Sequence, residues 1–257
     1  MGFFQNLDQL KVALDKCRPL PETILKNLHE DLVLKWTYHS NAIEGNSLTL
    51  KETKVALEGI TVGGKTIREH FEAINHRKAI YYVEQLVSEN EVLSEWQIKS
   101  IHQLILKNID DKSAGSYRKH NVIISGAEHV PPDALQLETA MRDFIEWYKM
   151  DGVNLHPVER AARVHVDFVK IHPFVDGNGR TSRLLMNLEL MKSGFPPVVL
   201  PVEKRLQYYE ALDTAHVKGD YAPFLELVAS VVADGFKPYW HALGIKTEQG
   251  KGADLHI

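Results

Sequence analysis

Apolar residues recur at intervals of three and four along most of this 257-residue chain, and this feature limits its fold most strongly. In residues 22–43 the apolar positions are Ile24, Leu25, Leu28, Leu32, Trp36 and Ile43. The same spacing predicts further helices over residues 66–88, 94–108, 133–149, 156–171, 180–191, 203–217 and 221–243. One short β-branched run, Val122-Ile123-Ile124, predicts a small hairpin that ends at Pro131-Pro132. The pattern predicts an all-α helical bundle with a small β-hairpin.

Local signals mark where several helices begin and end. Gly45 can take the left-handed conformation that often follows a helix C-terminus, so the helix from residue 22 should stop there. Thr49 and Glu52 have the spacing of a capping box, which predicts a new helix after Thr49. Pro157 stands where the first residue of the next long helix is expected, a position that favours proline.

Composition excludes several classes of protein. The formal net charge is −4 and no long basic run occurs, so we expect no nucleic-acid partner. No stretch approaches 18 apolar residues, so we expect no membrane-spanning helix. The single cysteine, Cys17, cannot form an internal disulfide, and a cytoplasmic location fits that.

The segment His172-Pro-Phe-Val-Asp-Gly-Asn-Gly-Arg-Thr-Ser-Arg183 lies between two predicted helices and predicts an anion site. Glycines on both sides of Asn178 let the backbone amides turn toward one point, and the helix that follows aims its positive end there. Arg180 and Arg183 are three residues apart on one helical face, where both can bind phosphate oxygens. Asp176 offers the oxygen ligand that Mg²⁺ prefers, and His172 can act as a general base. These residues together predict a polyphosphate site with a divalent cation.

Other interpretations of the same residues are weaker. Gly-Asn-Gly alone is common in simple turns, but the ordered set of histidine, aspartate and two arginines within twelve residues is not. The segment lacks the Gly-Lys-Ser/Thr of a P-loop and the preceding strand of a Rossmann loop. A metalloenzyme is disfavoured because His156, His165 and His172 are nine and seven residues apart, which does not give paired ligands on one helical face.

The segment resembles the signature of the Fic domain, His-Pro-Phe-x-Asp/Glu-Gly-Asn-Gly-Arg-x-x-Arg, at every specified position. The resemblance extends from about residue 30 to residue 232. It implies the Fic fold, in which helices surround a central helix-loop-helix, and an enzyme that moves AMP from ATP to a Ser, Thr or Tyr hydroxyl. It also implies that His172 deprotonates the hydroxyl and that Asp176 holds Mg²⁺, with Mn²⁺ as an alternative.

The resemblance assigns the remaining residues of this segment to the nucleotide. Gly177, Asn178 and Gly179 would cradle the diphosphate, Arg180 the β-phosphate side and Arg183 the γ-phosphate. Thr181 and Ser182 lie between the arginines and are grouped with the nucleotide-binding positions.

Two further segments complete the site that the resemblance implies. The predicted hairpin resembles the Fic flap, which binds an extended segment of the target protein by strand addition; Ile124, Glu128 and His129 are its candidate residues. On a later helix, Tyr208, Tyr209 and His216 are the adenine-side candidates. Near relatives carry Asn where this chain has His216, which leaves the choice of base open.

Ser40-Asn-Ala-Ile-Glu44-Gly45 resembles the inhibitory motif of Fic proteins, placed N-terminal to the core. The resemblance implies that Glu44 pairs with Arg183 and denies it to the γ-phosphate, so the isolated enzyme should be largely self-inhibited. In some relatives the same glutamate supports removal of AMP, which makes a hydrolase the main alternative; a non-enzymatic binding module is a weaker one.

The resemblance also divides the chain into parts. Residues 1–29 are expected to form a helical extension, residues 30–65 the inhibitory helix and its connection, and residues 66–245 the Fic core. Residues 246–257 are polar and are expected to be a disordered tail. A homodimer is compatible with this arrangement but is not indicated by any residue.

Overall fold

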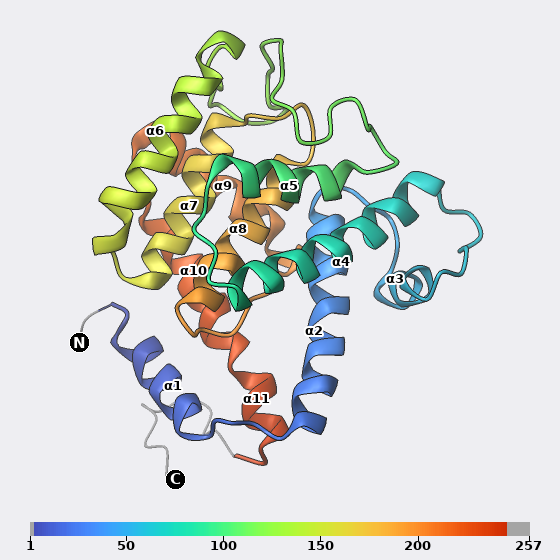
Figure 1. Ribbon diagram of the computed structural model, residues 1–257, viewed down its shortest axis with the longest axis vertical. Coiled ribbons are helices and arrows are strands. Elements are labelled where there is room, and N and C mark those ends of the chain that lie inside the picture. Colours follow the sequence, from blue (N-terminus) through green and yellow to red (C-terminus); the bar gives the residue numbers. More distant parts are fainter. Residues whose placement is uncertain (1–2, 246–257) are drawn as a thin grey trace.

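The computed structural model describes residues 3–245, and every regular element in that range is helical (Figure 1). The α-helices are α1 (Gln5–Lys16), α2 (Glu22–Ile43), α3 (Leu50–Leu57), α4 (Ile67–Ser88), α5 (Glu95–Leu106), α6 (Leu137–Met150), α7 (Pro157–Ile171), α8 (Asn178–Lys192), α9 (Arg205–Lys218), α10 (Ala222–Gly235) and α11 (Lys237–Ala242). The predicted all-α class is confirmed. The predicted tail, residues 246–257, lies outside the described residues.

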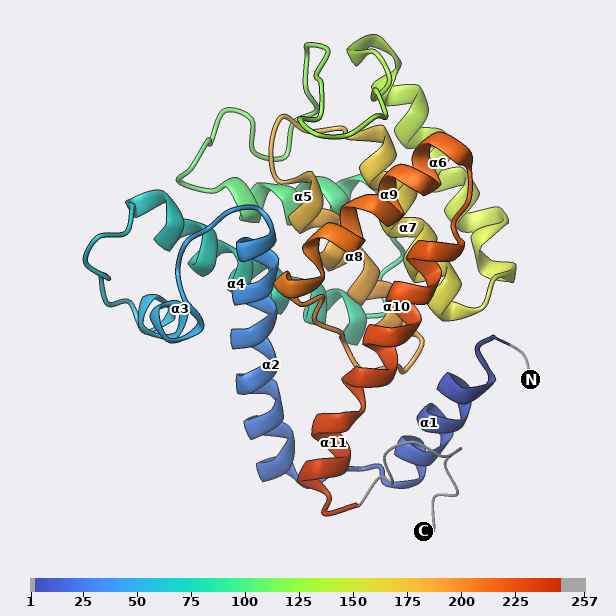
Figure 2. The same cartoon turned by 180° about the vertical axis from the view of Figure 1, so that it is seen from behind.

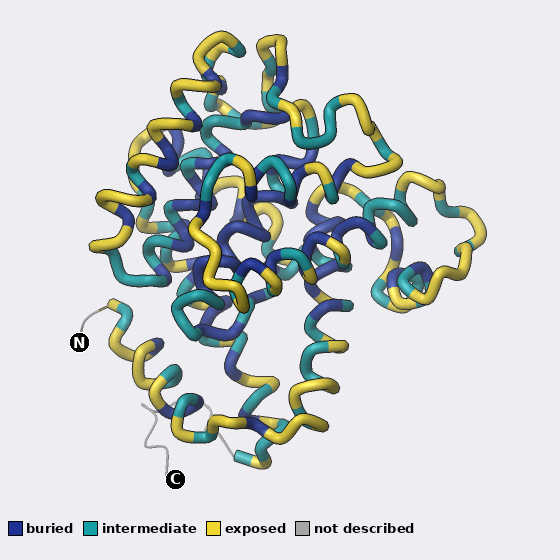
Figure 3. Tube along the Cα trace, in the orientation of Figure 1, coloured by how far each residue is buried: buried dark blue, intermediate teal, exposed yellow. Residues whose placement is uncertain are grey.

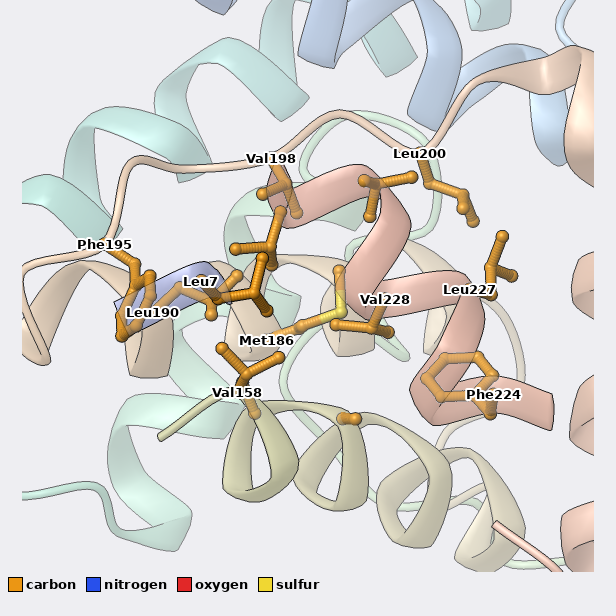
Figure 4. Packing of buried hydrophobic residues seen from close by; sticks show 14 of the residues in the cluster. Leu7, Val158, Met186, Leu190, Phe195, Val198, Leu200, Phe224, Leu227 and Val228 are labelled. Carbon is orange, nitrogen blue, oxygen red and sulfur yellow. The ribbon is translucent and has the colours of Figure 1, made fainter. Parts of the chain in front are cut away.

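Helix α8 forms the centre of the bundle, because twelve of its fifteen residues are buried. It packs along α7, and two apolar clusters lie on either side of this pair. One cluster joins α7 and α8 to α1, α9, α10 and α11, with Met186 of α8 among its members (Figure 4). The other joins them to α2, α4, α5 and α6. Each apolar face of the central pair is therefore covered, which fixes the loop between α7 and α8 in place.

Burial is unevenly distributed over the bundle. The buried positions run through its centre, whereas the connection from α3 to α4 is mostly exposed (Figure 3). This part projects to one side of the bundle in both ribbon views (Figures 1 and 2). Among residues 3–245, no helix is long and apolar enough to cross a membrane.

The predicted helix ends are mostly confirmed. Helix α2 has the predicted bounds, and Gly45 takes the left-handed conformation just after it, with φ +96°. The capping box of Thr49 and Glu52 is formed, and Pro157 is the first residue of α7. The single helix expected over residues 221–243 is wrong: the chain forms α10 and α11, which meet at Phe236. Pro238, near the start of α11, cannot supply the amide that a continuous helix would need.

The hairpin predicted over residues 122–132 forms as a turned loop, without regular strands in the part of the chain that is described. A turn at Gly126 reverses the chain, where the Ala127 amide donates to the Ile124 carbonyl at 3.2 Å. Pro131 and Pro132 have no amide hydrogen, so one side of the loop cannot complete a ladder. We refer to residues 121–131 as the flap.

The structure does not test the predicted division of the chain at residues 29, 65 and 245. Helix α2 runs without a break across the first of these boundaries. Leu7 and Leu14 of α1 lie in the same apolar cluster as α10. The four segments therefore stay a prediction.

Candidate active site

The loop between α7 and α8 is held open by its own residues. His172 ends α7 in a left-handed conformation, with φ +49°, and Gly177 precedes α8 with φ +78°. The Asn178 side chain accepts from the Phe174 amide at 3.0 Å and donates to the Phe174 carbonyl at 2.8 Å. The sequence assigned Asn178 to the diphosphate, but its amide group is engaged in closing the loop. Phe174 is fully buried beneath the loop, stacked on His102.

His172 is neutral in this arrangement. Burial and the nearby charge of Arg118 lower the pKa of the imidazole to about 4. The ring lines a pocket of about 340 Å³ together with Glu44 and Gly179. A neutral imidazole at the wall of a pocket can accept a proton from a group bound there.

Asp176 carries a negative charge that two arginines and an amide stabilise. Burial opposes its ionisation, but Arg180, the Gly177 amide and Arg68 outweigh that effect and lower its pKa. Arg180 donates to Oδ1 at 3.0 Å, and Arg68 donates to Oδ2 at 2.6 Å. The Asp176 side chain is 43% exposed, so the carboxylate remains within reach of a ligand.

The residues around Asp176 fit a magnesium ion that takes most of its ligands from bound phosphates and water. Between residues 3 and 245 no three His, Cys, Asp or Glu side chains gather closely enough to hold a metal by themselves. Mg²⁺ commonly uses one or two carboxylates, with phosphates and water as its other ligands. Asp176 is ionised and partly exposed, as such a site requires.

Arg180 is buried and only partly satisfied. It is 2% exposed, contacts Asp176, and lies 3.5 Å from the Glu72 carboxylate. Its Nε and Nη1 atoms have no hydrogen-bond partner in the described part of the chain. A buried guanidinium with unused donors is suited to bind a phosphate oxygen.

Arg183 is fully engaged by the N-terminal part of the chain. It donates from Nε to the Ser40 hydroxyl at 3.0 Å and from Nη2 to the Ser40 carbonyl at 2.8 Å. Nη2 also donates to Glu44 Oε1 at 2.8 Å, and Nη1 donates to the Tyr208 hydroxyl at 3.3 Å. Burial opposes its charge, but Glu44 and Tyr208 outweigh this and raise the pKa of Arg183. The predicted pair of Glu44 and Arg183 is thus present in the structure.

Glu44 is placed by the end of α2 and by a glycine of the loop. It is the residue that follows α2, and Gly45 turns the chain away behind it. A β-carbon added at Gly179 would collide with the Glu44 carboxylate, so the absence of a side chain there makes room for the glutamate. The carboxylate therefore lies over the first turn of α8, where the amides and the helix dipole favour an anion.

The other candidates divide into those at the pocket and those beneath it. Ile124 of the flap, Tyr208, Tyr209 and His216 line the pocket. Helix α9 carries Tyr208, Tyr209 and His216. Seen from behind, this helix passes near the C-terminal end of α2 (Figure 2). The Tyr209 hydroxyl donates to the Ile43 carbonyl at 3.1 Å.

Two predicted nucleotide-binding residues lie away from the pocket. Thr181 and Ser182 are fully buried. Ser182 donates to the Gly179 carbonyl at 2.8 Å and lies 3.0 Å from His165. Both side chains face the interior because α8 packs against α7 and α4. We therefore propose that Thr181 and Ser182 stabilise the loop rather than bind the nucleotide.

Two flap candidates differ in their surroundings. Glu128 is exposed and does not line the pocket. His129 lies behind the pocket, where its Nε2 is 2.9 Å from the Lys170 carbonyl and its ring is 5.0 Å from that of His216. His129 therefore ties the flap to α7.

Sequence reasoning missed two arginines. Arg68 reaches Asp176 from α4, and Arg118 lies under His172, 3% exposed. Arg118 follows a turn-like stretch that carries no periodic pattern, and Arg68 stands on a helix surface that predicts only solvent. Both contacts depend on tertiary packing, so no local signal could have found them.

The Fic/DOC family model matches residues 92–190 of the chain. The protein adenylyltransferase Fic of Nematostella vectensis is 41% identical over 230 residues, which are 88% of this chain and 53% of that protein. A structure of residues 134–508 of Fic-1 from C. elegans has a TM-score of 0.84 and 35% identity, covering 93% of this chain and 72% of that one. A Fic-domain signaling protein from Bacteroides thetaiotaomicron has a TM-score of 0.87 and 28% identity, covering 96% of this chain and all of that one. The chain spans about half the length of the curated relatives it matches.

Proposed function

The chain belongs to the Fic/DOC family, and from this premise we propose that it transfers AMP from ATP to a Ser, Thr or Tyr hydroxyl of a target protein. One observation carries the proposal. His172, Gly179 at the start of α8, and Glu44, which pairs with Arg183, all line one pocket of about 340 Å³. This arrangement supports a proton acceptor beside a polyphosphate site, as adenylyl transfer requires.

The chemical step is a displacement at the α-phosphorus of ATP. The neutral His172 ring accepts the proton of the target hydroxyl as its oxygen bonds to the α-phosphorus. The bond from that phosphorus to the oxygen bridging to the β-phosphate breaks, and diphosphate leaves. Negative charge on the bound phosphates favours the imidazolium, so the ring becomes a stronger base when the substrate is present.

The loop and the two arginines stabilise the charge that moves onto the diphosphate. The amides at the start of α8 and its dipole face the phosphates. Arg180 binds the β-phosphate side, and Arg183 binds the γ-phosphate once Glu44 has left it. Mg²⁺ bound at Asp176 would neutralise phosphate charge, and Mn²⁺ would serve as an alternative.

The flap is the proposed binding place for the target. Ile123 is 85% exposed, and no described segment pairs with the flap backbone as a strand. An extended target segment can add its own backbone hydrogen bonds to such an edge. This mode gives modest sequence selectivity and brings a target side chain near His172.

Glu44 holds this activity low in the resting protein. Its partner Arg183 is buried, so the charge of that guanidinium depends on Glu44 for compensation. The γ-phosphate must displace Glu44 to reach Arg183, and the carboxylate also occupies the start of α8. Both effects weaken productive binding of ATP.

Removal of AMP is a second candidate activity at the same site. It is favoured by the position of Glu44, which lines the pocket together with His172. There the carboxylate can orient a water molecule toward a phosphodiester, so that AMP and the free hydroxyl are formed. Release of AMP by the unmodified chain from a target that Glu44→Gly has modified would demonstrate it.

Intact mass measurement tests the proposed function. We expect Glu44→Gly protein, incubated with ATP and Mg²⁺, to gain the mass of AMP on itself or on a target in a cell extract. The unmodified chain should gain much less, and Glu44→Gly with His172→Ala should gain none. The proposal fails if no nucleoside triphosphate produces a mass gain with Glu44→Gly. Comparison of ATP with other triphosphates also resolves the base preference at His216.

A further inference from the structure

Arg118 occupies an unusual position below the catalytic loop. Its side chain is 3% exposed, and each of its three nitrogen atoms donates to a different backbone carbonyl. Nε donates to His172 O at 2.9 Å, Nη1 to His120 O at 2.9 Å, and Nη2 to Pro132 O. Its own amide donates to Pro173 O at 2.9 Å. One residue thus joins the histidine loop to the flap.

Two of the three carbonyls lie at the base of the flap. His120 and Pro132 stand immediately before and after the flap, and we call this pair of positions its neck. The Asn121 side chain, which donates to Asp133 at 2.7 Å, also closes the neck. Arg118 connects that neck to the backbone of His172 itself.

Arg118 forms this junction without a carboxylate partner. Its side-chain hydrogen bonds in the described range go to backbone carbonyls, and burial lowers its pKa, which the charge of Asp133 only partly offsets. A buried cation is costly, and a shorter or apolar side chain would leave three carbonyls without donors. Such a costly residue is expected where it fixes the relative positions of the parts of a site.

We propose that Arg118 is a positioning residue that holds the flap, and any target segment bound to it, in fixed register with His172. The inference rests on the proposed transfer reaction. The contact of His129 with the Lys170 carbonyl is a second link between the flap and α7, but it does not involve the His172 backbone. Displacement of a bound hydroxyl by about 1 Å can cost on the order of a hundredfold in rate.

The charge of Arg118 has a second effect, on the pKa of His172, which an uncharged side chain at position 118 would lack. The charged groups that face His172 are Arg118, which disfavours a positive imidazole, and Glu44, which favours one; the titratable rings of His129 and His216 also lie beside it. A neutral residue at position 118 should let His172 take up a proton at higher pH. A lysine should not.

The test compares Arg118→Gln, Arg118→Lys and the exposed neighbour Lys119→Gln, all in Glu44→Gly protein. We expect Arg118→Gln to lower kcat about 10- to 100-fold with nucleotide affinity nearly unchanged, and to move the acid limb of the pH–rate profile up by about one unit. Arg118→Lys should lower kcat but keep the acid limb in place. Lys119→Gln should match the parent.

Amide hydrogen exchange of the flap gives a readout that does not depend on transfer. Residues 121–131 should exchange faster in Arg118→Gln and Arg118→Lys than in Lys119→Gln. If Arg118→Gln does not fold, as judged by its circular dichroism spectrum and thermal unfolding, the lysine variant decides. Unchanged flap exchange, or a loss of rate that only follows a loss of nucleotide affinity, overturns the inference. Absence of transfer in the Glu44→Gly parent counts against the proposed function instead, and exchange still decides the role of Arg118.

Discussion

At the scale of single residues, the charged side chains of the site are paired with one another. Arg183 has a carboxylate, a hydroxyl, a carbonyl and a phenol as partners, so a phosphate must compete with all of them. Asp176 is also engaged, because Arg68 donates to one of its oxygens while Arg180 and an amide donate to the other. The side chains that we propose for the phosphate and for the metal are therefore both engaged by other residues of the chain.

Arg68 gives a prediction about the metal. Its side chain is 57% exposed, whereas Arg180 is buried, so a cation at Asp176 should displace Arg68. We expect Arg68→Ala, in Glu44→Gly protein, to lower the Mg²⁺ concentration for half-maximal ATP binding by about two- to fivefold, the range for a partly exposed ion pair. Calorimetric titration of ATP at a series of Mg²⁺ concentrations measures this.

The matched control is Arg142→Ala, which removes an exposed arginine of α6 that pairs with Asp143. It should leave the Mg²⁺ dependence unchanged. An equal dependence in Arg68→Ala would show that Arg68 does not compete with the cation.

At the scale of helices, local capping signals and tertiary contacts each help to fix where a helix begins. Thr66 accepts from the Glu69 amide and Glu69 accepts from the Thr66 amide, which closes a capping box at the start of α4. Glu69 also accepts from the Ser47 hydroxyl at 2.6 Å, and hydrogen bonds from Ser47 and Thr66 lower its pKa to about 2. The first turn of α4 is thus tied to the segment that follows Glu44, and the same turn carries Arg68.

Removal of this cap should destabilise the protein measurably. We expect Thr66→Ala to lower the free energy of unfolding by about 1 kcal/mol, which for a chain of this size lowers Tm by about 2–4 °C. Thr61→Ala, in the exposed loop before α4, should change Tm by less than that. Differential scanning calorimetry compares the two, and equal values would show that the box does not stabilise α4.

The same distinction explains which features the sequence could predict. The ends of α2, α3 and α7 depend on Gly45, Thr49 and Pro157, and each acts within a few residues of its own position, so these ends could be predicted. The loop residues could also be assigned, because their spacing on one helical turn fixes their relative positions.

Features that depend on packing could not be predicted in this way. The bonds of Arg118 reach residues 54 and 14 positions away, and that of Arg68 reaches 108 positions away. Thr181 and Ser182 were grouped with the nucleotide because they lie inside the signature segment, but α8 is enclosed by its neighbours and both side chains are buried in the core. A helical pattern shows which residues share a face, and the rest of the fold determines what that face meets.

At the scale of the whole molecule, histidines whose pKa is lowered by burial link stability to acidity. Burial lowers the pKa of His102, His172 and His216 to about 4, and it lowers that of His76 and His165 well below the ordinary value. Between about pH 6.5 and pH 4 the unfolded chain therefore binds more protons than the folded one, so stability falls as pH falls. The raised pKa of Glu189, set mainly by its burial, acts in the opposite direction.

We expect the urea midpoint to fall steadily between pH 7 and pH 5. A single histidine whose folded pKa lies far below 6.5 contributes a slope that approaches about 1.4 kcal/mol per pH unit as the pH falls below its unfolded pKa. Urea titrations at four pH values measure the slope. His120→Gln, at an exposed position, should leave it unchanged. A midpoint that stays constant down to pH 5 would contradict the effect assigned to the buried histidines.

We propose that the site as a whole transfers AMP and that Glu44 restrains this transfer. The most direct measurement incubates Glu44→Gly protein in parallel with ATP labelled at the α-phosphorus and at the γ-phosphorus, and counts the label that stays with denatured protein. We predict retention of the α-label only, its loss on His172→Ala, and much weaker retention by the unmodified chain. Retention of the γ-label, or equal α-labelling with and without Glu44, would contradict the account.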